Sequence, residues 1–377
     1  MKLESFKSGV WKKQFQYKSF SPSPVNHEWS WEDTRINLLL EQATRALGEL
    51  NAFSFIVPDV DLFIETHVVK EANASSRIEG TRTEMDEALM PEEAVKPENR
   101  DEWREVRNYI DAINQAIGEL KHLPLSNRLL RSTHATLMRG TRGDRKQPGE
   151  FRSSQNWIGG SGPIDAAFVP PHPDEVPDLM SDLEKFLHNS EIAVPDLIRA
   201  AIAHYHFETI HPFNDGNGRI GRLLITLFLV SRNVLAKPSL YLSDFFERNR
   251  SAYIDALMRV RTANDLNHWV RFFLAGVLEV SSKGRETFQK ILALRTEAET
   301  KCLSLGRRGT TARRALDVLF HTPIIYANSL AKALGITRQT ANLTIKDLEK
   351  LELLVEITGK ERWRLYKFEP YLSLFLR

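Results

Sequence analysis

The chain has 377 residues, of which 42% are hydrophobic and 27% are charged, with a formal net charge of +2. Its length and composition are typical of a globular protein of two or three domains with a large core. The small net charge excludes a general attraction to nucleic acid, and the single cysteine, Cys302, excludes an internal disulfide framework and a cysteine-based zinc site.

No apolar run reaches the roughly 18 residues of a membrane span. The first residues, MKLESFKSGVWKK, also lack the apolar centre of a signal peptide. We therefore expect a cytoplasmic protein with no membrane partner.

Along the first third of the chain, residues 1–30 predict loop or extended structure around Ser21-Pro22-Ser23-Pro24. Beyond them, apolar residues recur at intervals of three and four, which is the spacing of a helix with one buried face. These intervals predict helices over residues 29–50, 61–74, 84–89, 103–117 and 125–137.

Residues 139–173 are rich in Gly, Pro and Ser, which indicates that the helical pattern stops in this segment. Short apolar pieces at 157–158 and 166–169 flank a glycine-rich turn, a pattern that predicts a small β-hairpin. Helical spacing then returns over residues 174–188, 195–209, 219–231, 251–260, 266–282 and 284–303.

A linker at residues 305–309 leads into a separate C-terminal unit. We expect helices over 312–320, 329–334 and 338–351, followed by a hairpin built from 353–358 and 362–368. This order resembles a winged helix.

One face of the third C-terminal helix is polar and basic, which suits contact with DNA phosphates and base edges in the major groove. The residues of this face are Arg338, Gln339, Thr340, Asn342 and Lys346. The alternative is a unit used for protein docking or dimerisation.

The segment HPFNDGNGRIGR at residues 211–222 combines a histidine, an aspartate, two arginines and a glycine-rich turn within twelve positions. The glycine-rich turn opens an apolar helix, and the free N–H groups of a helix start favour an anion. Asp215 beside that anion site indicates a divalent cation, Arg219 and Arg222 suit phosphate, and His211 suits a general base. Together they predict a site for a nucleotide polyphosphate.

The same twelve residues match every defined position of the HPFxxGNGRxxR signature of the Fic family, which the chain resembles. No GxxxxGK[ST] run occurs that would indicate a Walker-type site instead. The resemblance implies a mainly α fold: a Fic helical core with a small β-hairpin flap, followed by a winged helix-turn-helix domain. We expect an N-terminal helical region over 1–100, the catalytic domain over 101–305 and the winged helix over 306–377.

The resemblance also implies a role for each residue of the motif. His211 would deprotonate a Tyr, Thr or Ser hydroxyl of a target protein, which then attacks the α-phosphorus of ATP. Asp215 would hold Mg²⁺, and Arg219 and Arg222 would bind the β- and γ-phosphates. The anion hole would be lined by Gly216, Asn217 and Gly218, with the Asn217 amide as a further donor. Family members that phosphorylate carry lysine at the position of Gly218.

Upstream, residues 148–159 resemble the family's flap, so Ile158 and Gly159 are expected near the nucleotide and the target strand. The alternative is a plain surface hairpin. For adenine, the candidates are Ala252 and Tyr253, unless Tyr253 is a core residue.

The histidines His204 and His206, just before the motif, are expected in the core or on a helix surface. Their spacing from His211 is poor for a metal site.

A second signature, Ser75-Ser76-Arg77-Ile78-Glu79-Gly80, matches the [S/T]xxxE[G/N] pattern of Fic proteins that carry their own inhibitory helix, here expected over about 61–80. A carboxylate can pair with a guanidinium and so keep it from phosphate. Glu79 would thus pair with Arg222, and Ser75 would support the helix end. Glu79 could instead orient water for removal of AMP.

These resemblances predict a self-inhibited protein adenylyltransferase that uses ATP and Mg²⁺, forms a homodimer and modifies a target protein or itself. The alternatives are a nucleotide-sensing DNA-binding regulator with little turnover, an enzyme that removes AMP, and the toxin half of a toxin–antitoxin pair.

Overall fold

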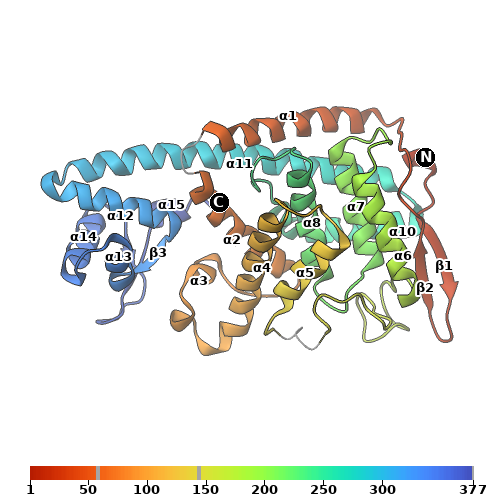
Figure 1. Cartoon of the computed structure of the whole chain (residues 1–377), viewed down its shortest axis with the longest axis horizontal. Coiled ribbons are helices and arrows are strands. Elements are labelled where there is room, and N and C mark those ends of the chain that lie inside the picture. Colours follow the sequence, from red (N-terminus) through yellow and green to blue (C-terminus); the bar gives the residue numbers. More distant parts are fainter. Residues whose placement is uncertain (57–59, 142–145, 376–377) are drawn as a thin grey trace.

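The computed structural model describes residues 1–56, 60–141 and 146–375 and is mainly helical, as predicted (Figure 1). The α-helices are α1 (Thr34–Ile56), α2 (Val60–Ile78), α3 (Met85–Leu89), α4 (Arg100–Glu119), α5 (Asn127–Met138), α6 (Val176–His188), α7 (Asp196–Ile210), α8 (Asn217–Ser231), α9 (Ser243–Arg248), α10 (Arg250–Ala263), α11 (Leu266–Leu303), α12 (Gly309–His321), α13 (Ala327–Leu334), α14 (Arg338–Lys350) and α15 (Glu369–Leu372). The strands are β1 (Gly9–Lys13), β2 (Lys18–Pro22), β3 (Ile324–Tyr326), β4 (Val355–Glu356) and β5 (Leu365–Lys367). Within these described ranges, none of the helices combines the length and the apolar character needed to traverse a bilayer.

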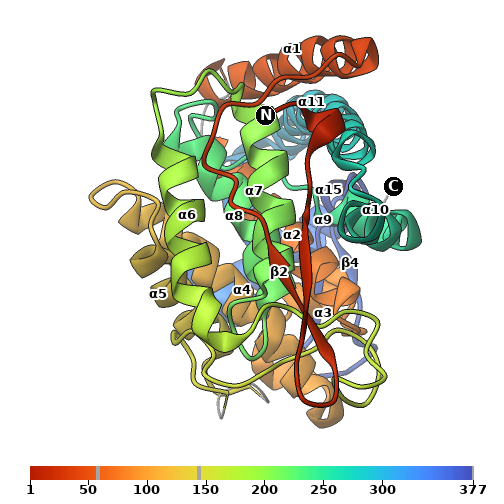
Figure 2. The same ribbon diagram turned by 90° about the vertical axis from the view of Figure 1, so that its right-hand side faces the viewer.

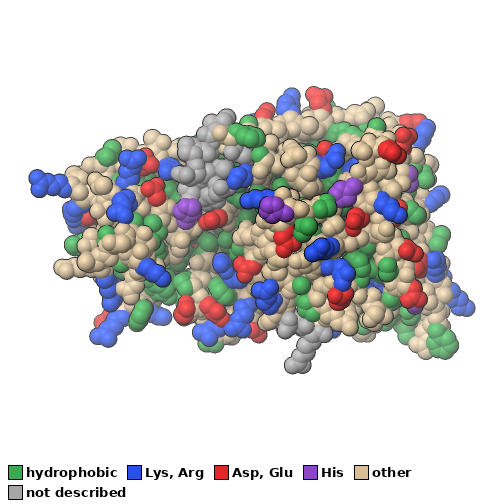
Figure 3. Space-filling model, in the orientation of Figure 1, with side chains coloured by type: hydrophobic (Ala, Val, Ile, Leu, Met, Phe, Trp, Pro, Cys, Tyr) green, Lys and Arg blue, Asp and Glu red, His purple; other side chains and the backbone are tan. Residues whose placement is uncertain are grey.

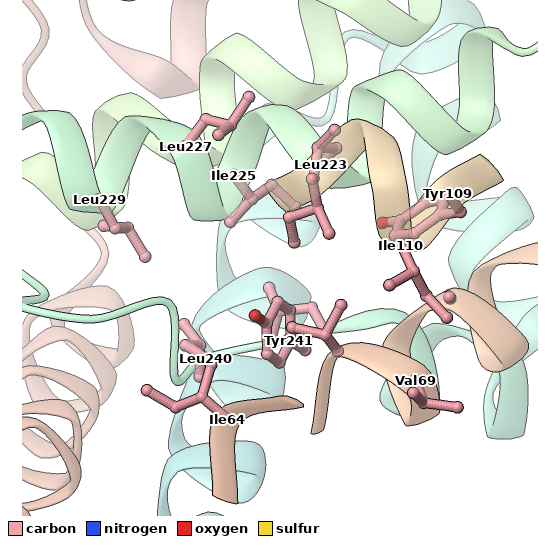
Figure 4. Packing of buried hydrophobic residues seen from close by; sticks show 14 of the residues in the cluster. Ile64, Val69, Tyr109, Ile110, Leu223, Ile225, Leu227, Leu229, Leu240 and Tyr241 are labelled. Atoms are coloured by element: carbon pink, nitrogen blue, oxygen red, sulfur yellow. The ribbon is translucent and has the colours of Figure 1, made fainter. Parts of the chain in front are cut away.

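Helices α7 and α8 lie at the centre of the core. Every residue of α7 from Leu197 to Ile210 is buried, including polar ones such as His204 and Glu208, so this helix is surrounded by the rest of the core. Figure 4 shows the α8 side chains Leu223 and Ile225 directed toward Ile64 and Val69 of α2. The motif loop therefore connects two buried helices, which fix both of its ends in the core.

The longest element is α11, which has 38 residues and lies alongside α1 (Figure 1). Two helices over 266–282 and 284–303 were expected here, and that division is wrong. Gly284 continues the helix, and a Cβ at this position would lie 3.1 Å from Leu50 Cδ1 of α1. The glycine thus permits close packing of the two helices and does not end α11.

The N-terminal hairpin of β1 and β2 was not predicted either, since only residues 21–24 were expected to be extended or loop within a mixed segment of residues 1–30. The strands are antiparallel, with Trp11 opposite Phe20. Both rings pack on Phe168, at centroid distances of 5.8 Å and 5.6 Å, and the Phe20 N–H donates to the Val169 carbonyl at 2.9 Å. These contacts come from a distant part of the chain, so local pattern could not indicate them.

The hairpin expected within residues 139–173 is reduced to one antiparallel bridge between Ile158 and Phe168. Between these two residues, the carboxylate of Asp165 accepts hydrogen bonds from the N–H groups of Ser161 and Gly162. Asp165 therefore stabilises a compact loop in place of a longer strand ladder.

The C-terminal unit contains the three expected helices, α12, α13 and α14, and a three-stranded antiparallel sheet with the order β3-β5-β4. Strand β3 was not predicted, and β4 and β5 are shorter than expected. This unit contacts α2, because Tyr371 and Thr66 form a hydroxyl–hydroxyl hydrogen bond of 3.0 Å. Lys367 also pairs with Asp86 of α3 at 2.9 Å.

Candidate active site

The motif loop begins where α7 ends. His211 caps α7 in the left-handed conformation (φ 52°, ψ 60°), and α8 begins at Asn217. Gly216, just before α8, has φ 73°, and a Cβ there would meet Met138 Sδ at 2.9 Å. A glycine is needed at this turn for both reasons. The first turn of α8 presents backbone N–H groups that have no partner within the helix.

His211 is fixed in place by hydrogen bonds to its main-chain N–H and carbonyl groups. Its N–H donates to the Phe207 carbonyl at 2.9 Å, and its carbonyl accepts from Arg152 Nε at 2.9 Å and Asn156 Nδ2 at 3.1 Å. Burial, assisted by the charge of Arg261, lowers the pKa of the imidazole to about 3. The ring is therefore neutral near pH 7, which is the form that can accept a proton.

Asn217 braces the motif loop from within. Its Oδ1 accepts the Phe213 N–H at 2.8 Å, and its Nδ2 donates to the Phe213 carbonyl at 2.8 Å. The side-chain donor that the resemblance assigns to an anion is thus used inside the loop. In this arrangement the main-chain N–H of Asn217 and the second hydrogen of its Nδ2 are the donors that are not used by Phe213.

Asp215 and Arg219 lie next to each other at the start of α8. The Asp215 side chain is 48% exposed, its Oδ1 accepts the Gly216 N–H at 2.6 Å, and it lies 3.8 Å from Arg219 Nη2. Arg219 is buried, and its Nε and Nη1 have no hydrogen-bond partner among the described residues, although Nη1 forms an ion pair of 3.6 Å with the buried Glu105 carboxylate. A buried guanidinium with unused donors is well suited to an anionic ligand.

Arg222 is bound by two residues at the end of α2. Its Nε donates to Ser75 Oγ at 2.9 Å, and its Nη2 donates to the Ser75 carbonyl at 2.9 Å and to Glu79 Oε1 at 2.7 Å. Glu79 lies one residue beyond the end of α2 at Ile78, not within the helix. A carboxylate is unfavourable at a helix C-terminus, and the pairing with Arg222 offsets that cost.

The charges around Glu79 favour its ionised form. Burial acts to raise the pKa of this carboxyl, but the ion pair with Arg222 and the nearby Arg219 outweigh burial and lower the pKa. Gly218 provides the space for this pair, since a Cβ there would lie 2.3 Å from Glu79 Oε1. The second signature, at residues 75–80, and the Fic signature, at residues 211–222, are therefore in contact through Glu79, Arg222 and Gly218.

Two polar residues of the flap segment, Arg152 and Asn156, were not singled out as site residues. The Arg152 N–H donates to the Pro212 carbonyl at 2.9 Å, and its Nη2 donates to Pro171 O at 2.6 Å. Asn156 Nδ2 donates to Phe213 O at 2.9 Å as well as to His211 O. They tie the flap to the motif loop, and only their place within the flap resemblance could have indicated this.

Two buried carboxyls were also missed. Glu208 lies on α7 one turn before His211, and burial raises its pKa to about 7. Its Oε1 would lie 2.2 Å from a Cβ at Gly221, next to Arg222. Glu71, on α2, accepts from Tyr109 Oη at 3.0 Å and from the Ser243 N–H at 3.1 Å. A single glutamate on an apolar helix is part of no sequence motif, so the sequence did not indicate that either residue lies near the site.

The residues expected near the nucleotide base and the target strand lie in different surroundings. Ile158 and Gly159 lie on the flap segment, beside the bridge to Phe168. Ala252 is exposed, whereas Tyr253 is only 3% exposed and stacks on Phe246 at 4.4 Å. This burial favours the core interpretation of Tyr253.

The histidines before the motif are both buried. His204 contacts Gly221 O at 2.7 Å and Tyr253 Oη at 2.9 Å, so it is a hydrogen-bonded core residue. Among the residues that the structure describes, no group of three His, Cys, Asp or Glu side chains could hold a metal ion.

The polar face of the C-terminal unit is exposed along α14. The side chains on this face are Arg338, Gln339, Thr340, Asn342 and Lys346. They lie on a different part of the molecule from the motif loop (Figure 1).

A helical core that mounts an HPFxxGNGRxxR loop between two buried helices defines a Fic-type protein. Residues 37–118 match the Fic/DOC family N-terminal region, and residues 124–229 match the Fic/DOC family. The chain therefore contains a Fic/DOC N-terminal region followed by a Fic/DOC domain.

Curated relatives resemble this chain over a quarter to a third of its length. The protein adenylyltransferase Fic of Aedes aegypti is 35% identical over 125 residues, which are 33% of this chain and 22% of the relative. A probable protein adenylyltransferase of Aquifex aeolicus is 40% identical over 92 residues, 24% of this chain and 26% of the relative. The match thus spans about a quarter of the length of these relatives.

Solved structures share the fold. A Fic family protein from Desulfovibrio desulfuricans aligns with a TM-score of 0.56 and 22% identity, covering 89% of this chain and 96% of that one. A Fic domain containing signaling protein from Bacteroides thetaiotaomicron aligns with a TM-score of 0.53 and 18% identity, covering 68% and 97%.

Proposed function

We propose that this chain is a self-inhibited protein adenylyltransferase whose catalytic domain covers residues 101–305. It transfers AMP from ATP to a Tyr, Thr or Ser hydroxyl of a target protein or of itself. The proposal is supported by the two Fic/DOC matches, by relatives named protein adenylyltransferases, and by the position of His211 at the end of α7, next to the start of α8.

In the proposed reaction, His211 accepts the proton of the target hydroxyl. The hydroxyl oxygen forms a bond to the α-phosphorus of ATP, the bond from that phosphorus to the bridging oxygen breaks, and pyrophosphate leaves. The N–H groups at the start of α8, with Arg219 and Arg222, bind the phosphates and offset the charge that develops on them.

The chain's own residues fit a Mg²⁺ ion in the manner that the resemblance implies. Asp215 places one half-exposed carboxylate at the helix start, and Mg²⁺ in nucleotide sites is commonly held by one or two carboxylates together with phosphate oxygens. When bound, the ion would neutralise phosphate charge. Asp215 is the residue we propose to hold it.

The position of Glu79 supports self-inhibition. The ion pair of 2.7 Å between Glu79 and Arg222 occupies the guanidinium that would otherwise bind the γ-phosphate, and this observation carries the proposal. The pair is partly enclosed, because the Arg222 side chain is 2% exposed and that of Glu79 is 42% exposed. Such charge-assisted hydrogen bonds are stronger than neutral ones, so a competing phosphate must displace a well-placed partner.

The experiment is incubation with Mg²⁺ and ATP labelled at the α-phosphate. We expect strong labelling of protein by Glu79→Gly, weak labelling by the wild type and none by Glu79→Gly/His211→Ala. Labelling that persists without His211 would contradict its role, and equal labelling with and without Glu79 would contradict self-inhibition. If Glu79→Gly loses AMP from labelled protein more slowly than the wild type does, Glu79 serves AMP removal as well.

A second function, DNA binding by the C-terminal unit, is favoured by the exposed polar face of α14. Replacing Arg338 and Lys346 by alanine should weaken binding to duplex DNA by about tenfold, with a smaller dependence on salt. The double variant Lys301→Ala/Lys237→Ala, away from this face, is the control. Sedimentation over a range of protein concentrations tests the expected homodimer.

A further inference from the structure

The N-terminal hairpin carries an exposed surface that is both aromatic and basic. Phe15, at its tip, is 95% exposed, and Trp11 is 44% exposed. Figure 3 shows hydrophobic side chains at the lower right of the molecule, where this hairpin ends in Figure 1. We define the hairpin surface as Trp11, Lys13, Phe15 and Lys18, all of them exposed. Lys13 and Lys18 lie on the same face of the hairpin as Trp11, because side chains alternate between the two faces of a strand.

Two lysines of this surface are in an unfavourable arrangement. Lys13 and Lys18 are direct cross-strand partners, and like charges opposite each other destabilise a hairpin. Among the described residues, neither lysine has an acidic partner, whereas the neighbouring Lys12 pairs with Glu175 at 2.7 Å. Residues 5–27 contain no Asp or Glu that could relieve the repulsion locally.

The hairpin surface is continuous with the candidate active site. Phe168 packs against Trp11 and Phe20 of the hairpin and bridges to Ile158 of the flap. At the other end of the flap, Tyr17 Oη donates to Gln155 Oε1 at 3.4 Å. The next residue, Asn156, donates to the main chain of His211.

The flap itself adds apolar area to this side of the molecule. Trp157 and Ile164 are both exposed large hydrophobic residues. Figure 2 shows the hairpin (red) running down among the yellow-green loops of residues 139–173. A target protein that places a hydroxyl over His211 and lies along the flap would therefore reach the hairpin.

We propose that the hairpin surface is a docking site for the target protein, and that the target presents carboxylate side chains and an apolar side chain next to the modified hydroxyl. The inference deepens the proposed adenylyl transfer and rests on it. Carboxylates of the target would offset the repulsion between Lys13 and Lys18, and its apolar side chain would cover Phe15.

A target protein explains these features better than a nucleic acid does. The exposed aromatic and basic residues are joined to the flap, which leads to the main chain of His211, the candidate base for a protein hydroxyl. Aromatic and basic side chains also bind single-stranded nucleic acid, so an oligonucleotide belongs among the probes.

The test uses the full chain with Glu79→Gly and three fluorescent peptides that each carry one Tyr and one Thr. The peptides differ in flanking residues, which are Glu with Leu, Lys with Leu, or Gly with Ser. Binding is read by fluorescence anisotropy without ATP, and transfer is read separately with ATP labelled at the α-phosphate. A single-stranded oligonucleotide is the fourth probe.

The charge variant is Lys13→Glu/Lys18→Glu, and its matched control is Lys332→Glu/Lys350→Glu, at exposed positions of the C-terminal unit. The apolar variant is Phe15→Ser, with Leu303→Ser at an exposed site on α11 as its control. Thermal unfolding and ATP affinity are measured for each variant to verify that the fold and the nucleotide site are intact.

We expect the acidic peptide to bind and to be modified best. Lys13→Glu/Lys18→Glu should weaken its binding and its kcat/KM by about fivefold and should favour the basic peptide instead. This difference should shrink at high salt, because surface charges are screened. Phe15→Ser should weaken binding of the acidic peptide alone, and the two controls should bind and modify the three peptides as the parent does.

If the charge variant preferred the same peptide as the parent, the docking inference would be overturned. Self-labelling in the same experiment would still support the adenylyltransferase proposal. A loss of oligonucleotide affinity without any effect on the peptides would overturn it as well, in favour of nucleic acid. If no protein or peptide were labelled, the adenylyltransferase proposal would fail, and anisotropy would still decide whether the surface prefers acidic peptides.

Discussion

Ser75 holds Arg222 with both its side chain and its main chain, because Nε of Arg222 donates to Ser75 Oγ and Nη2 donates to the Ser75 carbonyl, each at 2.9 Å. These two bonds orient the guanidinium so that Nη2 also reaches Glu79. The end of α2 therefore determines the direction of the arginine as well as neutralising its charge.

Ser75→Ala should weaken this hold. The loss of one buried hydrogen bond to a charged group is worth about 1–3 kcal/mol, so Arg222 should leave Glu79 more readily. We expect about a fivefold rise in α-phosphate labelling, smaller than the rise caused by Glu79→Gly. The matched control is Ser76→Ala, because Ser76 is equally buried and its Oγ has no partner in the described structure. A rise in both variants would assign the effect to the helix end and not to Ser75.

Asn217→Ala should damage the motif loop. It removes both hydrogen bonds to Phe213 and leaves the buried Phe213 N–H without a partner, while the Phe213 carbonyl keeps only its bond from Asn156. We expect the free energy of unfolding to fall by about 2 kcal/mol, with weaker ATP binding. Urea unfolding and ATP titration measure these two effects. Asn214→Ala, on the same loop but with contacts of 3.4 Å or longer, should change unfolding far less.

Glu208→Gln should stabilise the protein at alkaline pH. Burial raises the folded-state pKa of Glu208 to about 7, above its ordinary value of 4.5, so the folded protein loses stability as pH rises from 4.5 through 7. The neutral glutamine avoids this cost, and we expect a gain on the order of 2 kcal/mol at pH 8 and little at pH 4.5. Glu150→Gln, at an exposed site, is the control. An equal gain at both pH values would exclude titration of Glu208 as its cause.

His206→Phe should reduce acid sensitivity. Burial lowers the folded-state pKa of His206 to about 4, below its ordinary 6.5, so its neutral form contributes stability above pH 6.5 that is lost as pH falls toward 4. Neither ring nitrogen has a partner among the described residues, so phenylalanine sacrifices no hydrogen bond. We expect the loss of stability on acidification to shrink by up to about 1.4 kcal/mol per pH unit, measured by urea unfolding. His122→Gln, at the surface, should leave the slope unchanged.

The helices around the motif could be predicted because each has a regular apolar spacing within one stretch of sequence. The residues of the candidate site could be singled out for a similar reason, since 211–222 and 75–80 are both contiguous signatures. The sequence could not indicate interactions between distant segments. Phe168 supports the N-terminal hairpin, and Leu50 explains Gly284 within α11. The occupation of the Asn217 side chain by Phe213, within the motif itself, was missed because signatures record residue types and not hydrogen bonds.

The continuous α11 has a consequence for how this molecule unfolds. Its 38 residues correspond to a rod of about 57 Å that packs on α1 in the Fic part and on α12 in the C-terminal unit, where Arg295 pairs with Asp317 at 3.3 Å. A division of the chain at residues 305–309 is therefore not a division of the packed structure. Unfolding of either the Fic part or the C-terminal unit would remove packing contacts from α11. The two parts should therefore unfold in a single cooperative transition in calorimetry.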